Sequence, residues 1–328
     1  MSDTTPNIRF KGYTDDWEQR KLSEISDVRD GTHDSPSYLS AGHPFVTSKN
    51  VKEGYINYDD IQYISDEDFE AINKRSKVDV NDILMGMIGT IGNLALIRTE
   101  PDFAIKNVAL IKDTKQVSYM YLYHYLQSPS TERQLLSGLD GGTQKFVSLK
   151  NIRELNIMVP SEPEQIKVGT FMESLDNLIT LHQRKCDATK QLKKYMLQNL
   201  FPRKGAAKPE IRFSGFTDDW EERKLQEVAD FNPRCELPEE FEYVDLESVV
   251  GTEMVSHRTE SKETAPSRAQ RLAQTGDIFF QTVRPYQRNN HLFKKPDRNY
   301  VFSTGYAQMR PKIDADFLMS FLICQTKR

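Results

Sequence analysis

The chain has 328 residues, with 44 Lys and Arg against 48 Asp and Glu and a formal net charge of −4. This length suits about two domains of roughly 150 residues each, and the slightly acidic balance argues against indiscriminate adhesion to nucleic acid. No apolar run approaches the roughly 18 to 20 residues of a membrane span, the polar N-terminus does not resemble a secretion signal, and three scattered cysteines indicate neither a disulfide framework nor a zinc site. These features predict a cytoplasmic protein without a membrane segment.

A segment near the N-terminus returns later in the chain. IRFKGYTDDWEQRKLSEISD begins at Ile8, and IRFSGFTDDWEERKLQEVAD begins 203 positions later at Ile211, with fourteen of twenty positions identical. A period this long exceeds those of solenoid repeats, so each copy is predicted to be a whole domain with its connector. Within the segment, Thr-Asp-Asp-Trp predicts a short capped element that leads into a strand. Trp17 and Trp220 suit core anchors better than stacking on bases.

The region 1–160 is predicted to form a first globular domain of mixed α/β structure. Short apolar runs alternate with turn signals as far as Val46, and a helix begins at Asp66 with acidic residues in its first turn. The next apolar stretch is broken by Gly86, Gly89 and Gly92, a spacing that favours strands joined by a tight turn. A phosphate-binding loop is the alternative, but neither GxGxxG nor a following Lys-Ser/Thr pair is present.

Two features near the end of this domain bear on partner binding. The aromatic-rich helix predicted from Tyr119 suits the core better than a stacking platform for single strands. The following loop carries small and polar residues that would let a partner approach the backbone closely and meet a hydroxyl, an amide and a cation: Gly141, Gly142, Thr143, Gln144 and Lys145. A solvated turn is the alternative interpretation of this loop. A strand that ends at Pro160 closes the domain.

A long helix is predicted for residues 161–203. Ser161 as N-cap and Glu164 at the third helical position form a capping box, and Pro202 ends the helix. About 38 residues would make a rod of roughly 57 Å, and one apolar stripe on so long a helix requires a partner helix. The stripe keeps near-heptad spacing and predicts the helix-pairing residues Leu175, Leu178, Ile179, His182, Leu192 and Met196.

After a linker at residues 204–210, a second domain is predicted for residues 211–328. Its framework follows the first copy while its loops differ. In place of the glycines and apolar residues of the first copy, the second has a cluster that suits contacts with base edges and phosphates: Arg284, Tyr286, Gln287, Arg288, Asn289 and Asn290. A charged surface hairpin is the alternative. No second GGTQKF loop and no second long helix follow.

Together these pieces resemble the specificity subunit of type I restriction-modification systems. The repeated GYTDDWEQRKL and GFTDDWEERKL segments, the DGTHDSPSYLSAGHPFVTSKNVKEGYI stretch and the GGTQKFVSLKNIRELNIMVPSEPEQIKVGTFMESLDNLI junction carry the resemblance. It implies two similar target recognition domains, each reading half of a split double-stranded DNA sequence, separated by a long coiled-coil-like helix. By this analogy, the expected DNA contacts in the first copy are Thr32, His33, Ser48, Lys49, Asn50, Thr143, Gln144 and Lys145.

The resemblance also implies partners and a non-catalytic role. The long helices of the family dock methyltransferase subunits, and a translocating restriction (nuclease) subunit completes the complex. S-adenosylmethionine, ATP and Mg chemistry belongs to those subunits, so we expect no cofactor and no metal in this chain. In agreement, the sequence has no NPPY-type motif and no GxxxxGK[ST] motif. A nuclease activity of its own is disfavoured, since neither Pro101-Asp102 nor Pro296-Asp297 is followed by an acidic-x-Lys pair.

The sequence departs from the family pattern in lacking a second long helix. We expect a truncated subunit whose helix from Glu164 to Leu200 pairs with the same helix of another copy. Such a twofold dimer would favour a palindromic split target read by the first domain. The alternative is a silent, non-reading interaction protein that binds methyltransferase subunits through its helix.

Overall fold

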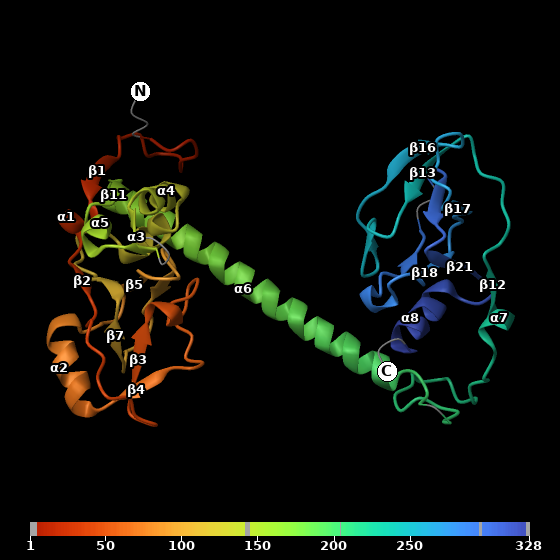
Figure 1. The fold of residues 1–328 in the computed structure, drawn as a ribbon, viewed down its shortest axis with the longest axis horizontal. Coiled ribbons are helices and arrows are strands. Elements are labelled where there is room, and N and C mark those ends of the chain that lie inside the picture. The colour runs from red at the N-terminus through yellow and green to blue at the C-terminus, as the bar shows by residue number, and fades with distance from the viewer. Residues whose placement is uncertain (1–4, 142–144, 204, 295–296, 326–328) are drawn as a thin grey trace. The chain divides into compact units, whose positions relative to one another are not determined.

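The chain divides into two compact units, residues 1–183 and 184–328, in a computed structural model that describes residues 5–141, 145–203, 205–294 and 297–325 (Figure 1). The division falls within the long helix α6 (Glu162–Asn199). At 38 residues, α6 has the length that the sequence predicts. No helix in the described part of the chain is both long and apolar enough to cross a lipid bilayer.

Unit 1 contains two main sheets. The four-stranded sheet is antiparallel and has the order β2 (Val28–Asp30), β8 (Val108–Ile111), β5 (Ile83–Gly86), β6 (Leu94–Leu96). The three-stranded sheet has the order β4 (Gln62–Ile64), β3 (His43–Thr47), β7 (Ala104–Lys106), with β3 and β7 parallel. The antiparallel pairing of β5 with β6 confirms the predicted strand pair around the glycines.

Strand alternation explains how the core of unit 1 is divided. Ile83 and Met85 of β5 belong to one buried cluster with residues of α3 (Tyr119–Leu126), while Leu84 belongs to another with Val46 and Ile105. The four-stranded sheet therefore packs against α3 on one face and against the three-stranded sheet on the other. The burial of α3 confirms that its aromatic residues serve the core.

The predicted helix at Asp66 is confirmed as α2 (Asp66–Ser76), where the Ser65 hydroxyl accepts a hydrogen bond from the Asp68 amide at 3.2 Å. It packs beside β7 and covers the three-stranded sheet with Phe69 and Ile72 (Figure 1). Helices α4 (Pro129–Ser137) and α5 (Leu149–Arg153) were not predicted from the sequence. The unit also contains η1 (Ser48–Asn50) and the short strands β9 (Leu139–Asp140) and β10 (Phe146–Val147).

The repeated segment joins the two ends of unit 1. Residues 14–17 form no helix, so the predicted capped element was wrong, but they lead into the predicted strand, β1 (Glu18–Lys21), and the short helix α1 (Leu22–Ile25) follows it. β1 pairs antiparallel with β11 (Asn156–Val159), the predicted strand before Pro160. Trp17 packs edge-on against Tyr121 with ring centroids 6.0 Å apart, which confirms its role as a core anchor.

The start of α6 is tied to the same segment by an ion pair. Both carboxylate oxygens of Glu164 accept hydrogen bonds from the Arg9 guanidinium, each at 2.7 Å, and the Glu164 side chain is 1% exposed. Glu164 was expected to complete a capping box with Ser161. Its carboxylate instead fixes the entry of the long helix against the N-terminal segment, across 155 positions of sequence.

Unit 2 repeats this architecture. Its antiparallel sheet has the order β12 (Ala229–Phe231), β21 (Tyr306–Pro311), β18 (Ile278–Gln281), β19 (His291–Leu292), which matches β2-β8-β5-β6. Its second sheet has the order β16 (Arg258–Ser261), β13 (Glu240–Val244), β20 (Tyr300–Ser303), β17 (Ala269–Leu272), with β13 and β20 parallel like β3 and β7. The remaining elements are α7 (Leu225–Val228), β14 (Val249–Val250), β15 (Glu253–Met254), η2 (Pro285–Gln287) and α8 (Ala315–Gln325).

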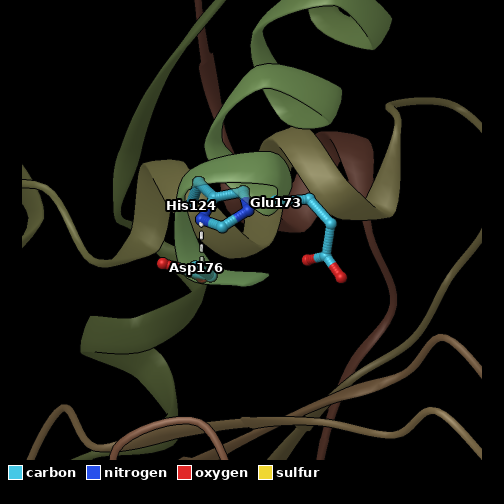
Figure 2. A group of neighbouring side chains, drawn as sticks. All are labelled: His124, Glu173 and Asp176. Carbon is cyan, nitrogen blue, oxygen red and sulfur yellow. Dashed lines mark ion pairs between the residues drawn. The ribbon is translucent and has the colours of Figure 1, made fainter. Parts of the chain in front are cut away.

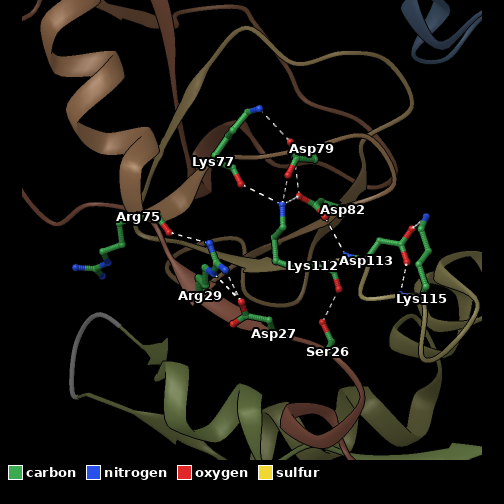
Figure 3. Close-up of polar contacts among 10 residues, drawn as sticks. All are labelled: Ser26, Asp27, Arg29, Arg75, Lys77, Asp79, Asp82, Lys112, Asp113 and Lys115. Carbon is green, nitrogen blue, oxygen red and sulfur yellow. Dashed lines mark hydrogen bonds and ion pairs between the residues drawn. The ribbon is translucent and has the colours of Figure 1, made fainter.

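The two copies also share a buried ion pair at the same place in the sheet. Asp82 and Asp277 stand just before β5 and β18, and each side chain is 1% exposed. Asp82 accepts a hydrogen bond from the Lys112 ammonium at 2.6 Å (Figure 3), and Asp277 accepts two from the Arg310 guanidinium at 2.9 Å. Burial of Lys112 disfavours its charge, but hydrogen bonds from Lys112 to Asp79 and Asp82 outweigh this and raise its pKa.

We expect Asp82→Asn to lower the free energy of unfolding of unit 1 by about 2 kcal/mol, because the amide leaves a largely buried lysine without its full charge partner. Each unit holds one tryptophan, so Trp17 fluorescence in a Trp220→Phe background reports unit 1 in a urea titration. Lys74→Gln is the control, since Lys74 is exposed and makes no ion pair with any residue that the structure describes. Equal destabilisation by both substitutions would contradict the expectation.

Candidate nucleic-acid interface

Hydrogen bonds link the predicted contact segments of unit 1 in a chain. The His33 ring nitrogen Nδ1 lies 2.7 Å from the Asn107 side-chain oxygen, and the Asn107 carbonyl accepts a hydrogen bond from the Ser48 hydroxyl. That hydroxyl accepts one from the Met87 amide at 3.0 Å, and the Met87 carbonyl accepts one from the Val147 amide at 3.0 Å. The DGTH stretch, the η1 turn and the end of the Gly-rich loop therefore converge at one edge of the four-stranded sheet, where β2 and β5 end and β8 begins.

The position of Thr32 and His33 depends on the glycine before them. A Cβ on Gly31 would lie 2.4 Å from the Ile105 carbonyl oxygen, so only glycine fits there. The Thr32 amide donates to the same carbonyl at 3.0 Å. The second ring nitrogen of His33 lies 2.9 Å from an Asp30 carboxylate oxygen, and the ring is 64% exposed. His33 is therefore held on two sides and still open to solvent.

Asp30 supports His33 as a charged group. Its burial disfavours the charge, but the hydrogen bond and positive charge of Arg75, followed by those of His33, outweigh this and hold the pKa of Asp30 below its usual range. Arg75 comes from the end of α2, so that helix contributes to the orientation of the imidazole.

The three predicted contacts of the η1 turn differ in exposure. Ser48 is 5% exposed and Asn50 is 2% exposed. The Asn50 side-chain oxygen accepts from the Thr47 amide at 3.0 Å, and its nitrogen donates to the Asn57 carbonyl at 3.1 Å. Both buried side chains shape the turn, and among the three only Lys49 is exposed to solvent.

The Gly-rich loop is described in part. Thr143 and Gln144 lie outside the described residues. Lys145 is exposed, and Phe146 beside it forms a bridge with Ile88 in the turn between β5 and β6. Lys145 therefore lies next to the same sheet edge as Lys49 and His33.

In unit 2 the corresponding turn follows β18 and is braced by Gln281, which is 1% exposed. The Gln281 side-chain nitrogen donates to the Gln287 side-chain oxygen at 2.9 Å, and its oxygen accepts from the Asn289 amide at 3.0 Å. The Gln281 backbone amide donates to the Asn290 side-chain oxygen at 2.9 Å. The Gly251 backbone amide donates to the Asn289 side-chain oxygen, also at 2.9 Å. Gln287, Asn289 and Asn290 thus hold the turn together. Gln281 was not predicted as a site residue from the sequence, although it occupies the position of Gly86 in the first copy.

The other three predicted residues of this turn face solvent. Tyr286 is 76% exposed, and Arg284 and Arg288 are exposed without an ion pair to any residue that the structure describes. Both arginines have φ of 57°, in the left-handed region that costs a residue with a side chain about 1 kcal/mol or more. The braced turn holds them there despite this cost, so their guanidinium groups are available to an acidic or hydrogen-bonding partner.

The predicted pairing residues of α6 are also largely open to solvent. Leu178, Ile179 and Leu192 are 50%, 66% and 54% exposed, and Leu175 is 37% exposed. His182 is exposed, whereas Met196 is half-buried. Leu181 and Tyr195, which are 62% and 53% exposed, widen the apolar stripe. Exposed apolar side chains repeated along one helix are typical of an interaction surface.

Comparisons with known proteins agree with the sequence resemblance. The profile of the type I restriction modification DNA specificity domain matches residues 14–191. The chain is 26% identical over 167 residues to the EcoBI specificity subunit of Escherichia coli, and 25% identical over 293 residues to the MjaIX specificity subunit of Methanocaldococcus jannaschii. These matches cover 49% and 85% of this chain but only 35% and 59% of the two relatives.

The fold is also similar to that of a solved protein. The crystal structure of a type I restriction-modification S subunit from M. genitalium superposes with a TM-score of 0.61 at 13% identity, over 98% of this chain and 80% of that one. The mixed α/β fold with a long helix is thus the fold of this structure as well. Because the matching family profile spans more than half of the chain, this protein belongs to the type I restriction-modification DNA specificity family.

Proposed function

We propose that this chain selects the split DNA target of a type I restriction-modification complex. This proposal rests on one observation: each unit has a four-stranded antiparallel sheet of the same strand order, and the two units present different polar side chains at equivalent edges of these two sheets. Unit 1 presents His33, Lys49 and Lys145, and unit 2 presents Arg284, Tyr286 and Arg288. A shared framework with unlike exposed loops is what two unlike half-sites require.

The proposal places the chemistry in other subunits. Methyltransferase subunits would bring S-adenosylmethionine, and the restriction subunit would bring the ATP- and Mg-dependent activity. The apolar stripe of α6 supports pairing with a second long helix, which we propose to be that of another copy. A rod of about 57 Å can hold two readers one DNA turn of about 34 Å apart or somewhat more.

The test is methylation by the purified chain together with its cognate methyltransferase subunit and S-adenosylmethionine, followed by long-read modification sequencing of genomic DNA. A split motif with two unlike halves would show that both units read. A palindromic split motif would support pairing of two first units across the helix. No modified motif in a stable complex would refute the proposal and leave a non-reading interaction protein.

Neutralising Lys49 and Lys145 together is expected to weaken DNA binding of the complex about equally on specific and non-specific duplexes. Each lysine that contacts a phosphate contributes about one unit to the slope of log affinity against log salt, so the double glutamine variant should lose about two units. Fluorescence anisotropy across a salt series measures this slope. Lys11→Gln, an exposed lysine of the repeated segment, is the control. An unchanged slope in the double variant would remove these lysines from the interface.

A further inference from the structure

A second constellation of polar side chains lies where α3 meets α6. His124 comes from α3, and Glu173 and Asp176 stand three positions apart on α6, which places them on one face of that helix (Figure 2). One ligand atom of each residue lies within 4.8 Å of those of the other two. Sequence spacing gave no indication of this site, because His124 and Glu173 are 49 positions apart.

His124 is the unusual member of this group. Its side chain is only 6% exposed, and its Nε2 atom has no hydrogen-bond partner in the part of the chain that the structure describes. Its Nδ1 atom lies 3.9 Å from an Asp176 carboxylate oxygen, beyond hydrogen-bonding distance. In Figure 2 this nitrogen faces Asp176, and the second nitrogen lies on the side of the ring toward Glu173. An unsatisfied buried nitrogen is destabilising, and a ligand on it would offset that cost.

The three side chains offer metal ligands of two kinds. The imidazole of His124 supplies a nitrogen ligand. The two carboxylates supply oxygen ligands, and Asp176, whose side chain is 48% exposed, leaves a path from solvent.

Arg98 must be reconciled with such a site. Its guanidinium donates to both oxygens of Glu173, at 2.8 and 2.9 Å. Each carboxylate oxygen keeps a second lone pair, so this contact does not exhaust Glu173. Ligating carboxylates are commonly oriented by an outer hydrogen-bond donor, and Arg98 can fill that role. An ion pair alone would explain Arg98 and Glu173 but leaves the buried imidazole unsatisfied.

We propose that His124, Glu173 and Asp176 bind one divalent first-row transition-metal ion, with zinc the best fit. One imidazole nitrogen and two carboxylate oxygens form a ligand set that zinc accepts, with water in the fourth position, whereas magnesium and calcium prefer oxygen ligands alone. Bonds of about 2.0 to 2.1 Å place tetrahedral ligands about 3.3 Å apart, so the three side chains must close slightly. The ion would cross-link α3 to α6 and fix the first turns of the long helix on unit 1.

The test is a titration of the full-length chain with Co²⁺, after dialysis against a chelator, followed by competition with Zn²⁺. We expect one Co²⁺ per chain with visible absorption typical of nitrogen and oxygen ligands. The absence of a thiolate charge-transfer band separates this site from the exposed Cys186 and Cys235. His124→Gln and Asp176→Asn should each weaken binding at least 10-fold. Glu162→Gln, at an exposed carboxylate of the same helix, should leave it unchanged.

Thermal unfolding gives a second measurement that does not depend on the visible absorption of Co²⁺. Zn²⁺ should raise the melting temperature of the parent and of Glu162→Gln, but not that of Asp176→Asn. Asp176 is half-exposed, so its variant should keep the parent circular dichroism spectrum even if His124→Gln does not fold. Equal affinity of the parent and Asp176→Asn for Co²⁺, or no bound Co²⁺ in the parent, would overturn the site.

Discussion

Replacing both Arg284 and Arg288 by alanine is expected to lower the affinity of the methyltransferase complex for its target about 100-fold. Each arginine contact with a base edge contributes about 1 to 3 kcal/mol, so two contacts contribute about 2 to 6 kcal/mol, a range that includes the roughly 2.7 kcal/mol of a 100-fold loss. The turn itself should persist, because Gln281, Asn289 and Asn290 hold it without help from either arginine. Fluorescence anisotropy on a duplex that carries the sequenced motif, at one fixed salt concentration, measures the change.

The same titration on a duplex without the motif separates two roles of these arginines. Contacts with bases would lower affinity for the target alone, whereas contacts with phosphates would lower affinity for both duplexes. Lys262→Ala is the matched control, since Lys262 is half-exposed in the same unit and pairs with Glu239. If the double alanine variant kept the affinity and the sequence preference of the parent, unit 2 would not read DNA through this turn.

The exposure of polar residues in these loops was beyond the reach of the sequence. Ser48, Asn50 and Asn290 are the same kinds of residue as those that contact bases, and only the tertiary fold shows that their hydrogen bonds are used internally. The glycine spacing, by contrast, was enough to predict the pairing of β5 with β6, because it depends on local backbone conformation. The length of α6 was likewise predictable, because apolar residues recur at helical spacing over a long segment and Pro202 follows it.

The repeated segment shows why local sequence can mislead. Fourteen of twenty positions are identical, yet residues 18–21 form a strand and their counterparts at 221–224 do not. In unit 1 that strand exists through its pairing with β11, and no counterpart of β11 occurs among residues 205–294 and 297–325. Whether this segment forms a strand therefore depends on a pairing partner far away in the sequence. The strand order of the sheets, by contrast, is shared by the two units, because both copies keep the framework residues.

Charging the apolar stripe of α6 is expected to abolish helix pairing. We expect Leu178→Lys combined with Ile179→Lys to weaken self-association of the chain at least 1,000-fold. Burying one such side chain contributes about 1.5 to 3 kcal/mol, and a twofold pair loses four of them. Sedimentation equilibrium at micromolar concentration measures the change, with a dimer expected for the parent and a monomer for the variant. Thr180→Lys, an exposed residue outside the predicted stripe, is the control and should leave the parent dimer intact.

The same variants show which partner occupies the stripe. Lysines at exposed helical positions should leave the fold of either unit unchanged, so circular dichroism should match that of the parent. A monomeric parent would contradict self-pairing. If that monomer bound the methyltransferase subunit and the double lysine variant did not, the stripe would belong to the methyltransferase interface. If the parent is a dimer, and the variant is a monomer that no longer directs methylation, helix pairing is required for target selection. The reason would be that the two readers are no longer held at a fixed separation on one duplex.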